Sequence, residues 1–250
     1  MRLDPGALSV LSTLREAGFR ALLAGGCVRD MLMGTEPVDW DIATDAGPDQ
    51  VSELFSRTLP VGAHFGISVV LLDQGQYEVA RFRRDGPYLD GRHPARVEPA
   101  DECADAQRRD FTINGLFYDP FQDVIIDYVG GRDDIERGLV RAIGDPHARF
   151  REDYLRLLRC VRFAARFDFS IDDSTRMALS ALTDGIESIA AERVEEELTR
   201  MLTDSGAVRG LELMMECGLL SAILPEVARL RGVEQPPEFH PEATFGRIRC

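Results

Sequence analysis

The order in which two hydrophobic periods follow one another is the feature that most constrains this chain. Up to about residue 145, segments with the two-residue period of strands alternate with segments of helical period. Beyond that point only the helical period is found, and it predicts helices over 152–167, 172–182, 191–202 and 206–217. Mixed elements followed by helices alone predict an α+β fold, with a domain boundary near 140–147.

Within the mixed segment, the pattern predicts helices over 7–18, 28–33, 48–57 and 109–117. It predicts strands over 19–24, 38–42, 67–72, 77–82 and 124–126. Residues 83–105 are rich in glycine, proline and charge and show no clear period, so they are predicted to form a long loop, a feature that is often functional in a compact domain.

The charge is distributed unevenly along the chain. The formal net charge is −14, and because the sequence contains no lysine, all 29 basic residues are arginines. Residues 81–166 carry 16 arginines and 16 acidic residues, whereas acid is in excess on both sides of them. The overall sign excludes a histone-like polybasic protein. The arginine-rich third fits two interpretations, namely ordinary solvated surface or a strip that binds phosphate.

Cysteine usage and apolar runs bear on the compartment. The five cysteines form no CxxC pair, so neither a disulfide framework nor a structural zinc site is expected. No apolar run approaches the roughly 20 residues of a membrane span, and the first ten residues contain no apolar core of a signal peptide. We therefore expect a cytoplasmic protein without a membrane partner.

Two aspartates form the first candidate site. Asp39 and Asp41 are two residues apart on a predicted strand, so both side chains point to one face. Paired carboxylates suit Mg²⁺, which takes protein oxygens together with substrate phosphates. Gly25 and Gly26 lie upstream in a turn, where the absence of a side chain lets the backbone approach a phosphate. The chain has neither a P-loop nor a GxGxxG motif.

Three further segments carry charge in unusual places. Glu78 lies in an apolar strand, where it either binds metal or simply faces solvent or an arginine. Arg108 and Arg109 stand at a predicted helix start, where the helix dipole disfavours cations unless an anion is bound. In 152–167, four arginines share one arc of the helix, opposite an apolar arc; they are Arg156, Arg159, Arg162 and Arg166. Asp153 and Arg156 are neighbours at i, i+3, which also fits a plain surface ion pair.

Several motifs, in order, resemble one known family. They are LAGGCVRDMLMG with DWDIAT (23–44), EVARFR (78–83), RRDFTINGLFYDP (108–120), DYVGGRDDIERGLVRAIGD (127–145), EDYLRLLRCVRFAARFDFSI (152–171) and AERVEEEL (191–198). The chain resembles the class II tRNA nucleotidyltransferases, or CCA-adding enzymes, and the bacterial poly(A) polymerases, within the polymerase-β-like superfamily. Tyrosine after Asp153, where the poly(A) polymerases typically have proline, favours the CCA-adding side.

The resemblance implies a domain organisation. Residues 1–143 would form a nucleotidyltransferase head with a mixed sheet and flanking helices, and 144–204 a helical neck that selects the nucleotide and binds RNA. Residues 205–250 would begin a helical body that is expected to be truncated. The chain itself would be a template-independent nucleotidyltransferase that adds C or A from CTP and ATP to the 3′ end of tRNA.

The resemblance also implies the roles of individual residues. Asp39, Asp41 and Glu78 would hold two Mg²⁺ ions. Gly25, Gly26, Arg29, Arg108 and Arg109 would contact the triphosphate, with Asp110 at the ribose 2′-hydroxyl. Asp153 and Arg156 would read the base, with Arg159 and Arg162 beside them. An acceptor and donor pair complements the edges of cytosine and adenine and mismatches those of uracil and guanine.

Two other functions stay open on the sequence. One is a poly(A) polymerase, and the other is a truncated module that binds nucleotide or RNA without turnover. Cys27 and Cys160 are expected to pack in cores, and the lone histidines His64 and His240 to be structural rather than metal ligands.

Overall fold

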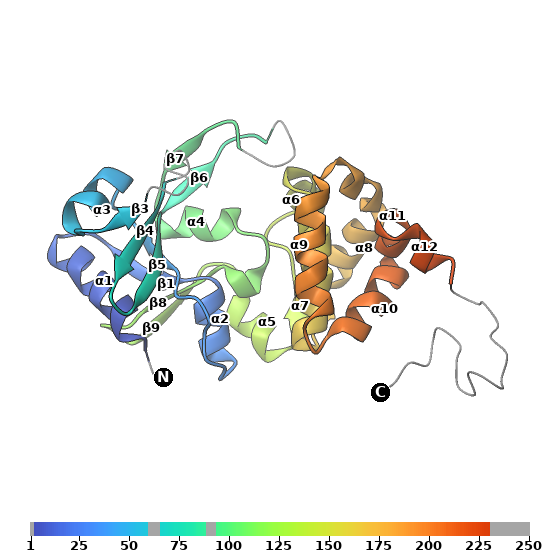
Figure 1. Cartoon of the computed structure of the whole chain (residues 1–250), viewed down its shortest axis with the longest axis horizontal. Helices are drawn as coiled ribbons and strands as arrows, with labels where there is room; N and C mark the ends of the chain where they lie inside the picture. The colour runs from blue at the N-terminus through green and yellow to red at the C-terminus, as the bar shows by residue number, and fades with distance from the viewer. Residues whose placement is uncertain (1–2, 60–65, 89–93, 231–250) are drawn as a thin grey trace. The chain divides into compact units, whose positions relative to one another are not determined.

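The computed structural model describes residues 3–59, 66–88 and 94–230. The chain forms two compact units, of which the first comprises residues 1–137 and 141–144 and the second residues 138–140 and 145–250. Figure 1 shows a sheet with helices in the first unit and mainly helices in the second. This combination confirms the predicted α+β fold class. No helix of the described residues is long and apolar enough to cross a membrane.

A seven-stranded mixed sheet forms the centre of the first unit. Its strands follow the order β3-β4-β5-β2-β1-β8-β9. Neighbouring strands are antiparallel except β2 and β5, which run parallel. The bounds are β1 Ala21–Ala24, β2 Ile42–Thr44, β3 Thr58–Leu59, β4 Ile67–Leu72, β5 Gly75–Arg81, β8 Leu116–Asp119 and β9 Val124–Asp127. The strand predicted over 38–42 instead begins at Ile42, the residue after Asp41.

The two faces of this sheet are covered by different amounts of apolar side chain. Side chains alternate along a strand, so Leu23 and Leu22 of β1 point to opposite faces. Leu23 belongs to the larger core, to which the helices α1 (Pro5–Glu16), α2 (Gly26–Leu32) and α3 (Pro48–Leu54) contribute. Leu22 belongs to a smaller core with Phe117 and with Ala106 of α4 (Glu102–Arg108). The smaller core leaves room on its face for polar groups.

Residues 109–117 do not form the predicted helix. Helix α4 ends at Arg108, a short 3₁₀ turn η2 spans Thr112–Asn114, and β8 follows directly. Between them the extended Phe111 forms a β-bridge with Ala142, a partner that local periodicity does not reveal. Arg108 thus closes a helix, where the dipole favours a cation, and the helix-start argument made from the sequence was wrong.

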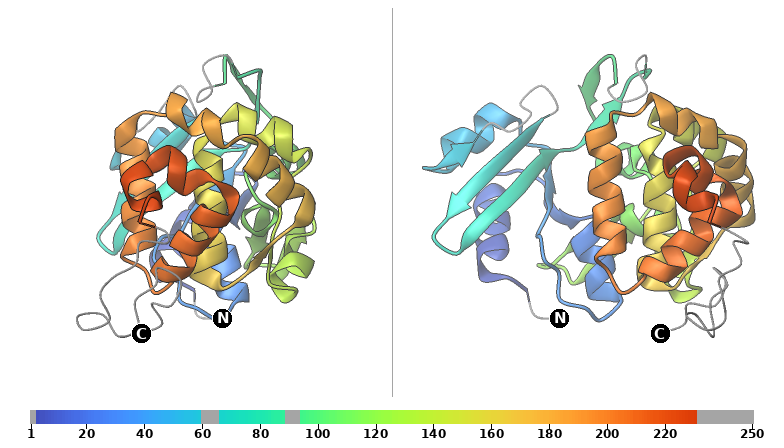
Figure 2. Two further views of the ribbon diagram at one scale, coloured as in Figure 1. Left: turned by 90° about the vertical axis from the view of Figure 1, so that its right-hand side faces the viewer. Right: turned by 45° about the vertical axis from the view of Figure 1, so that its right-hand side comes forward.

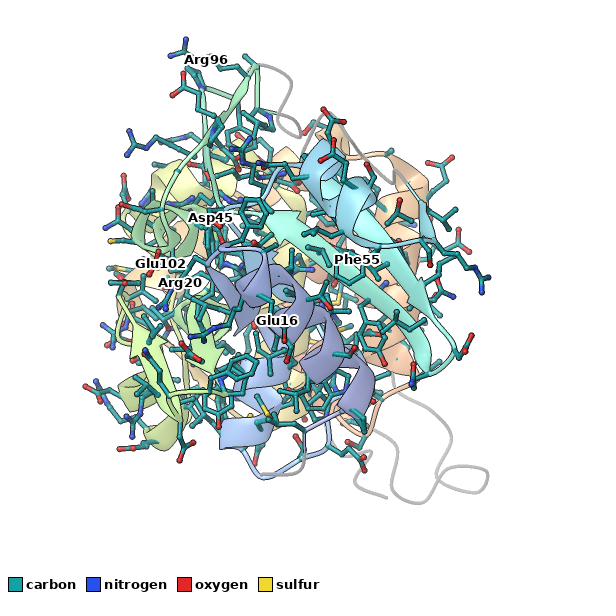
Figure 3. The ribbon with its side chains drawn as sticks, turned by 90° about the vertical axis from the view of Figure 1, so that its left-hand side faces the viewer. Glu16, Arg20, Asp45, Phe55, Arg96 and Glu102 are labelled. Atoms are coloured by element: carbon teal, nitrogen blue, oxygen red, sulfur yellow. The ribbon has the colours of Figure 1, made fainter. Side chains whose placement is uncertain are left out.

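Residues 83–105 are more ordered than predicted. Strands β6 (Arg83–Asp85) and β7 (Val97–Pro99) pair as an antiparallel hairpin, and α4 begins at residue 102. Residues 89–93 lie outside the described part of the chain. Figure 3 shows Arg96 on this hairpin, away from Arg20, Asp45 and Glu102, which lie together at the sheet. There Arg20 donates its backbone N–H to Asp45 at 2.8 Å and pairs with Glu102 at 3.5 Å.

The second unit is a helical assembly. Its helices are α6 Pro146–Glu152, α7 Leu155–Phe167, α8 Asp173–Ala181, η3 Thr183–Ser188, α9 Ala191–Leu202, α10 Ala207–Cys217, α11 Leu219–Ile223 and α12 Pro225–Ala228. The short strands β10 (Leu139–Val140) and β11 (Ser170–Ile171) pair in parallel within this unit, which the prediction of helices alone had missed. α5 (Gly131–Glu136) belongs to the first unit.

Helices α7 and α9 lie side by side in the second unit (Figure 2). The apolar face of α7 is fully buried, with Leu157, Leu158 and Val161 at 0% exposure. The helix predicted over 152–167 is interrupted at Asp153, whose Oδ1 accepts the backbone N–H of Leu155 at 3.1 Å. Asp153 therefore ends α6 and stands at the entrance of α7.

Candidate active site

The predicted acidic residues meet in the middle of the sheet, where β2 and β5 run parallel. Asp39 and Asp41 precede β2, and Ile42 pairs with Val79 of β5. One residue earlier along both strands, Asp41 is level with Glu78. Because Val79 packs in the larger core, its neighbour Glu78 points to the opposite face, as does Asp41 next to Ile42. Both carboxylates thus lie on the face of the smaller core.

These carboxylates raise one another's proton affinity. Burial, the charge of Glu78 and that of Asp39 raise the pKa of Asp41 to about 6, although Arg109 acts in the opposite direction. Withdrawal from water and the charge of Asp39 likewise raise the pKa of Glu78, whose side chain is still exposed. Around Asp41 and Glu78, burial and neighbouring acids thus outweigh the nearby arginines and disfavour the ionised carboxylates. A bound cation would stabilise the ionised form.

The donor set fits a hard divalent cation, which is held by oxygen ligands. Within residues 3–59, 66–88 and 94–230, no group of three His, Cys, Asp or Glu side chains is arranged to hold a metal ion by itself. Two carboxylates that repel one another, completed by phosphate oxygens of a nucleotide, match the way Mg²⁺ binds in phosphoryl-transfer sites. The residues present therefore suit a metal that arrives with its substrate, rather than a preformed protein cage.

The glycine turn lies beside these acids, where β1 leads into α2. Gly25 has φ = 71° and ψ = −125°, a backbone conformation that L side chains rarely adopt. A Cβ at this position would come within 2.8 Å of Nη1 of Arg109. Ala24, just before the turn, donates its N–H to the backbone carbonyl of Asp41 at 3.0 Å. The glycine turn is therefore in contact with the segment that carries Asp41 and with Arg109.

Arg108 and Arg109 share a single buried carboxylate. Asp105 is 1% exposed, and its Oδ1 accepts Nε of Arg108 at 2.8 Å while its Oδ2 accepts Nη2 of Arg109 at 2.9 Å. Burial alone would raise the pKa of Asp105, but these two arginines hold it below its usual value. The guanidinium of Arg109 also lies over the ring of Phe117, 5.1 Å from its centroid. The arginine is therefore fixed on the same face as Asp41.

Arg29 and Asp110, which are distant in sequence, are joined by an amide. Arg29 is 5% exposed and donates from Nη1 to Oδ1 of Asn114 at 2.6 Å, and from Nε to Asp30 at 2.8 Å. Nδ2 of Asn114 donates to Oδ1 of Asp110 at 3.0 Å. Oδ1 of Asp110 also accepts the N–H of Phe111 at 2.8 Å. These contacts place the predicted phosphate-binding and ribose-reading residues in one hydrogen-bonded group.

In the second unit, Asp153 pairs with an arginine of α9 and not with Arg156. Its carboxylate accepts two hydrogen bonds from Arg193, at 2.7 and 3.3 Å. Arg156 donates to the backbone carbonyl of Arg149 at 2.9 Å and to the carboxylate of Glu152. The side chains of Asp153 and Arg156 are therefore held by different partners, while the backbone N–H of Arg156 donates to the carbonyl of Asp153 at 3.0 Å.

The other arginines of α7 turn toward Glu197 of α9 and toward Asp204, which follows α9. Arg162 is 6% exposed and donates from Nε to Oε2 of Glu197 at 2.6 Å, while Arg159 lies 3.5 Å from Oε1 of the same residue. Arg166 lies 3.4 Å from Asp204. The residue numbers of the paired side chains rise together in both segments, so α7 and α9 run in the same direction. We call these contacts the α7–α9 ion pairs; they make the predicted arginine arc an interface within the unit.

Sequence reasoning missed four polar residues that organise these groups. They are Asp105, Asn114, Arg193 and Glu197. For Asn114 a signal existed, since it is the only asparagine in the sequence and stands within the RRDFTIN segment. For Arg193 and Glu197 the AERVEEEL motif was noted, but its partners 35 to 40 residues away were not.

The cysteines and histidines behave as follows. Cys27 and Cys160 are buried, as expected for core packing, and burial raises the pKa of the Cys27 thiol to about 12. The described cysteines are free thiols. His64 and His240 lie outside the described residues.

Comparison with known proteins gives consistent relatives. A poly(A) polymerase head domain model matches residues 21–141, and a model of the probable RNA and SrmB-binding site of polymerase A matches 168–230. The CCA-adding enzyme of Geobacillus thermodenitrificans is 40% identical over 223 residues, covering 89% of this chain and 55% of that enzyme. That of Levilactobacillus brevis is 40% identical over 215 residues, covering 85% and 54%.

Solved structures show the same fold. The crystal structure of the Bacillus stearothermophilus CCA-adding enzyme in complex with CTP matches with a TM-score of 0.80 at 35% identity, covering 91% of this chain and 56% of that chain. The chain thus spans about half the length of the relatives it matches. With two family models in sequence order and these identities, the chain belongs to the family of tRNA nucleotidyltransferases (CCA-adding enzymes) and poly(A) polymerases.

Proposed function

We propose that this chain is a template-independent nucleotidyltransferase that adds C and/or A from CTP and ATP to the 3′ end of tRNA. One observation carries the proposal: two carboxylates that repel one another, Asp41 and Glu78, lie on one face of the sheet with the fixed guanidinium of Arg109. Acids that need a cation, next to an arginine suited to phosphate, are the parts that phosphoryl transfer from a nucleoside triphosphate requires.

In this proposal each group of the first unit has one task. Asp39, Asp41 and Glu78 hold two divalent metal ions, which we propose to be Mg²⁺. When bound, the metal supplies charge neutralisation and activation of the attacking hydroxyl. Gly25, Gly26, Arg29, Arg108 and Arg109 bind the triphosphate, and Asp110 accepts a hydrogen bond from the ribose 2′-hydroxyl.

The second unit would select the base. Asp153 accepts and Arg156 donates, a combination that complements cytosine and adenine. Both side chains are held before any nucleotide arrives, Asp153 by Arg193 and Arg156 by Glu152. Arg159 and Arg162 support this surface from the neighbouring turns of α7. Preorganised partners of this kind lower the entropic cost of binding.

We further propose the assignment of residues 1–143 as the nucleotidyltransferase head, 144–204 as the neck and 205–250 as the start of a helical body. The tRNA 3′ end is the proposed macromolecular partner. The cytoplasm is the proposed location, in keeping with the free thiols of the described cysteines.

Incorporation assays test the function directly. The purified chain is given labelled CTP or ATP, MgCl₂, and tRNA transcripts that end before CCA, after the first C or after the second C. Addition that stops at CCA supports the proposal, with the Asp41→Ala variant inactive. A long A tail would identify a poly(A) polymerase instead. Binding of CTP and ATP without incorporation into any transcript would identify a module without turnover.

A further inference from the structure

Asn114 occupies an unusual position for a side chain without a proposed role. It ends the 3₁₀ turn η2 between α4 and β8 and is 8% exposed. It is also the only asparagine among the 250 residues. A buried amide must satisfy its donors and acceptors inside the protein, because an unpaired polar group is costly there.

Asn114 touches three of the residues proposed to bind the nucleotide. Its Oδ1 accepts Nη1 of Arg29 at 2.6 Å, and its Nδ2 donates to Oδ1 of Asp110 at 3.0 Å. Its backbone carbonyl accepts Nη1 of Arg109 at 3.3 Å. Arg29 lies in α2, whereas Arg109 and Asp110 are consecutive residues directly after α4, so one residue links two separate parts of the first unit.

The side-chain contacts require a group that both accepts and donates hydrogen bonds. Arg29 can only donate, and an ionised Asp110 can only accept. A residue between them must therefore accept on one side and donate on the other. A carboxylate in this place would satisfy Arg29 and repel Asp110, and an apolar side chain would satisfy neither.

We propose that Asn114 is a positioning residue that couples the triphosphate-binding arginines to the ribose-reading carboxylate, and thereby sets the preference for ribonucleotides. This inference rests on the proposed function, because it assumes that Arg29 and Asp110 contact the same nucleotide. Two donors on Oδ1 of Asp110, from Asn114 and from the backbone of Phe111, fix the orientation of the carboxylate. Loss of one donor frees the rotation on which recognition of the 2′-hydroxyl depends.

Equilibrium binding of ATP and dATP in MgCl₂ measures this preference without a tRNA or turnover. The Asn114→Asp variant keeps the volume and the acceptor for Arg29, and replaces the donor to Asp110 with a negative oxygen. A hydrogen bond to a charged group is worth at least tenfold in a binding ratio, so the ratio of the dATP and ATP dissociation constants should fall by about tenfold. The Asn114→Ala variant, which lacks both side-chain contacts, should lower the ratio as well.

Thr112 provides a matched control. It lies in the same 3₁₀ turn, is 2% exposed, and donates from Oγ1 to Asp134 at 2.7 Å. The Thr112→Val variant should lower the melting temperature and leave the dATP to ATP ratio as in the wild type. Thermal unfolding of all variants shows whether each one is folded under the conditions of the binding assay.

The outcomes separate the inference from the function on which it rests. A wild type that binds neither nucleotide refutes the proposed function and this inference with it. A wild type that prefers ATP, with an unchanged preference in folded Asn114→Asp and Asn114→Ala, refutes the inference alone. An equal loss of preference in Thr112→Val shows that the turn as a whole, and not the amide, sets the selection, and also overturns it.

Discussion

Replacing Asp41 with asparagine should stabilise the first unit at neutral pH while removing a proposed catalytic group. Burial, Glu78 and Asp39 raise the pKa of Asp41 from 3.8 to about 6. Each pKa unit corresponds to about 1.4 kcal/mol, so the ionised carboxylate costs the fold about 3 kcal/mol near pH 7.5. Asparagine has almost the same shape without the charge and should recover most of this free energy. A gain of that size raises the melting temperature by about 6 °C or more.

The pH dependence of stability provides a separate test of the direction of this effect. Because the folded-state pKa of Asp41 is raised, the native state binds the proton more tightly than the unfolded chain does. Wild-type stability contributed by this group therefore increases as the pH falls from about 7 to about 3, where both states are protonated. The difference between the variant and the wild type should be largest above about pH 6 and close to zero near pH 3.

Urea titrations in EDTA at several pH values measure this difference. Fluorescence of Trp40, the only tryptophan, reports the unfolding of the first unit next to the substitution. Asp73→Asn, at an exposed turn residue, is the control and should change stability little at any pH. MgCl₂ should then stabilise the wild type more than the Asp41→Asn variant, since a ligand of the native state stabilises by mass action.

Two results would refute this reasoning about Asp41. One is an Asp41→Asn variant that is less stable than the wild type near pH 7.5. The other is a stability difference that stays the same between neutral pH and about pH 4.

Three other substitutions have definite expected effects. Asp105→Asn should destabilise the first unit by about 3 kcal/mol at neutral pH, since it removes the buried carboxylate that Arg108 and Arg109 share; because the pKa of Asp105 is lowered, urea titrations should show the difference diminishing as the pH falls below about 4. Gly25→Ala should weaken CTP binding by about tenfold or more in calorimetry, because its Cβ would meet Arg109 at 2.8 Å and displace a positioned group. Glu197→Ala should destabilise the second unit by about 3–5 kcal/mol in thermal unfolding, since Arg162 is then buried without a partner.

Local pattern predicted those parts of the fold in which neighbours in sequence determine the structure. The alternation of Leu22 and Leu23 between two cores follows from the two-residue period of a strand. The glycine turn at Gly25 was likewise visible, because only glycine suits its positive φ. The acidic site was predicted from the spacing of Asp39 and Asp41, although β2 itself begins one residue after Asp41.

Contacts between distant residues account for the failures. The stretch 109–117 has a helical pattern, but Phe111 is drawn into a bridge with Ala142, and the chain extends there. The helix predicted from residue 152 is broken where Asp153 ends α6 and binds Arg193, 40 residues away. The role of Asn114 required knowing that Arg29, 85 residues earlier, lies beside it. Periodicity contains no information on such pairs.

The α7–α9 ion pairs have a consequence for how the second unit would meet an RNA. A polyanion gains affinity chiefly when its contacts release condensed counterions, and each free cationic side chain adds to that release. Arg162 and Arg166 are matched by carboxylates of their own chain, so an approaching phosphate finds guanidinium groups already neutralised. RNA held at this helix would therefore lose little affinity as salt is raised, and its selectivity would come from the geometry of the fixed side chains rather than from the number of arginines.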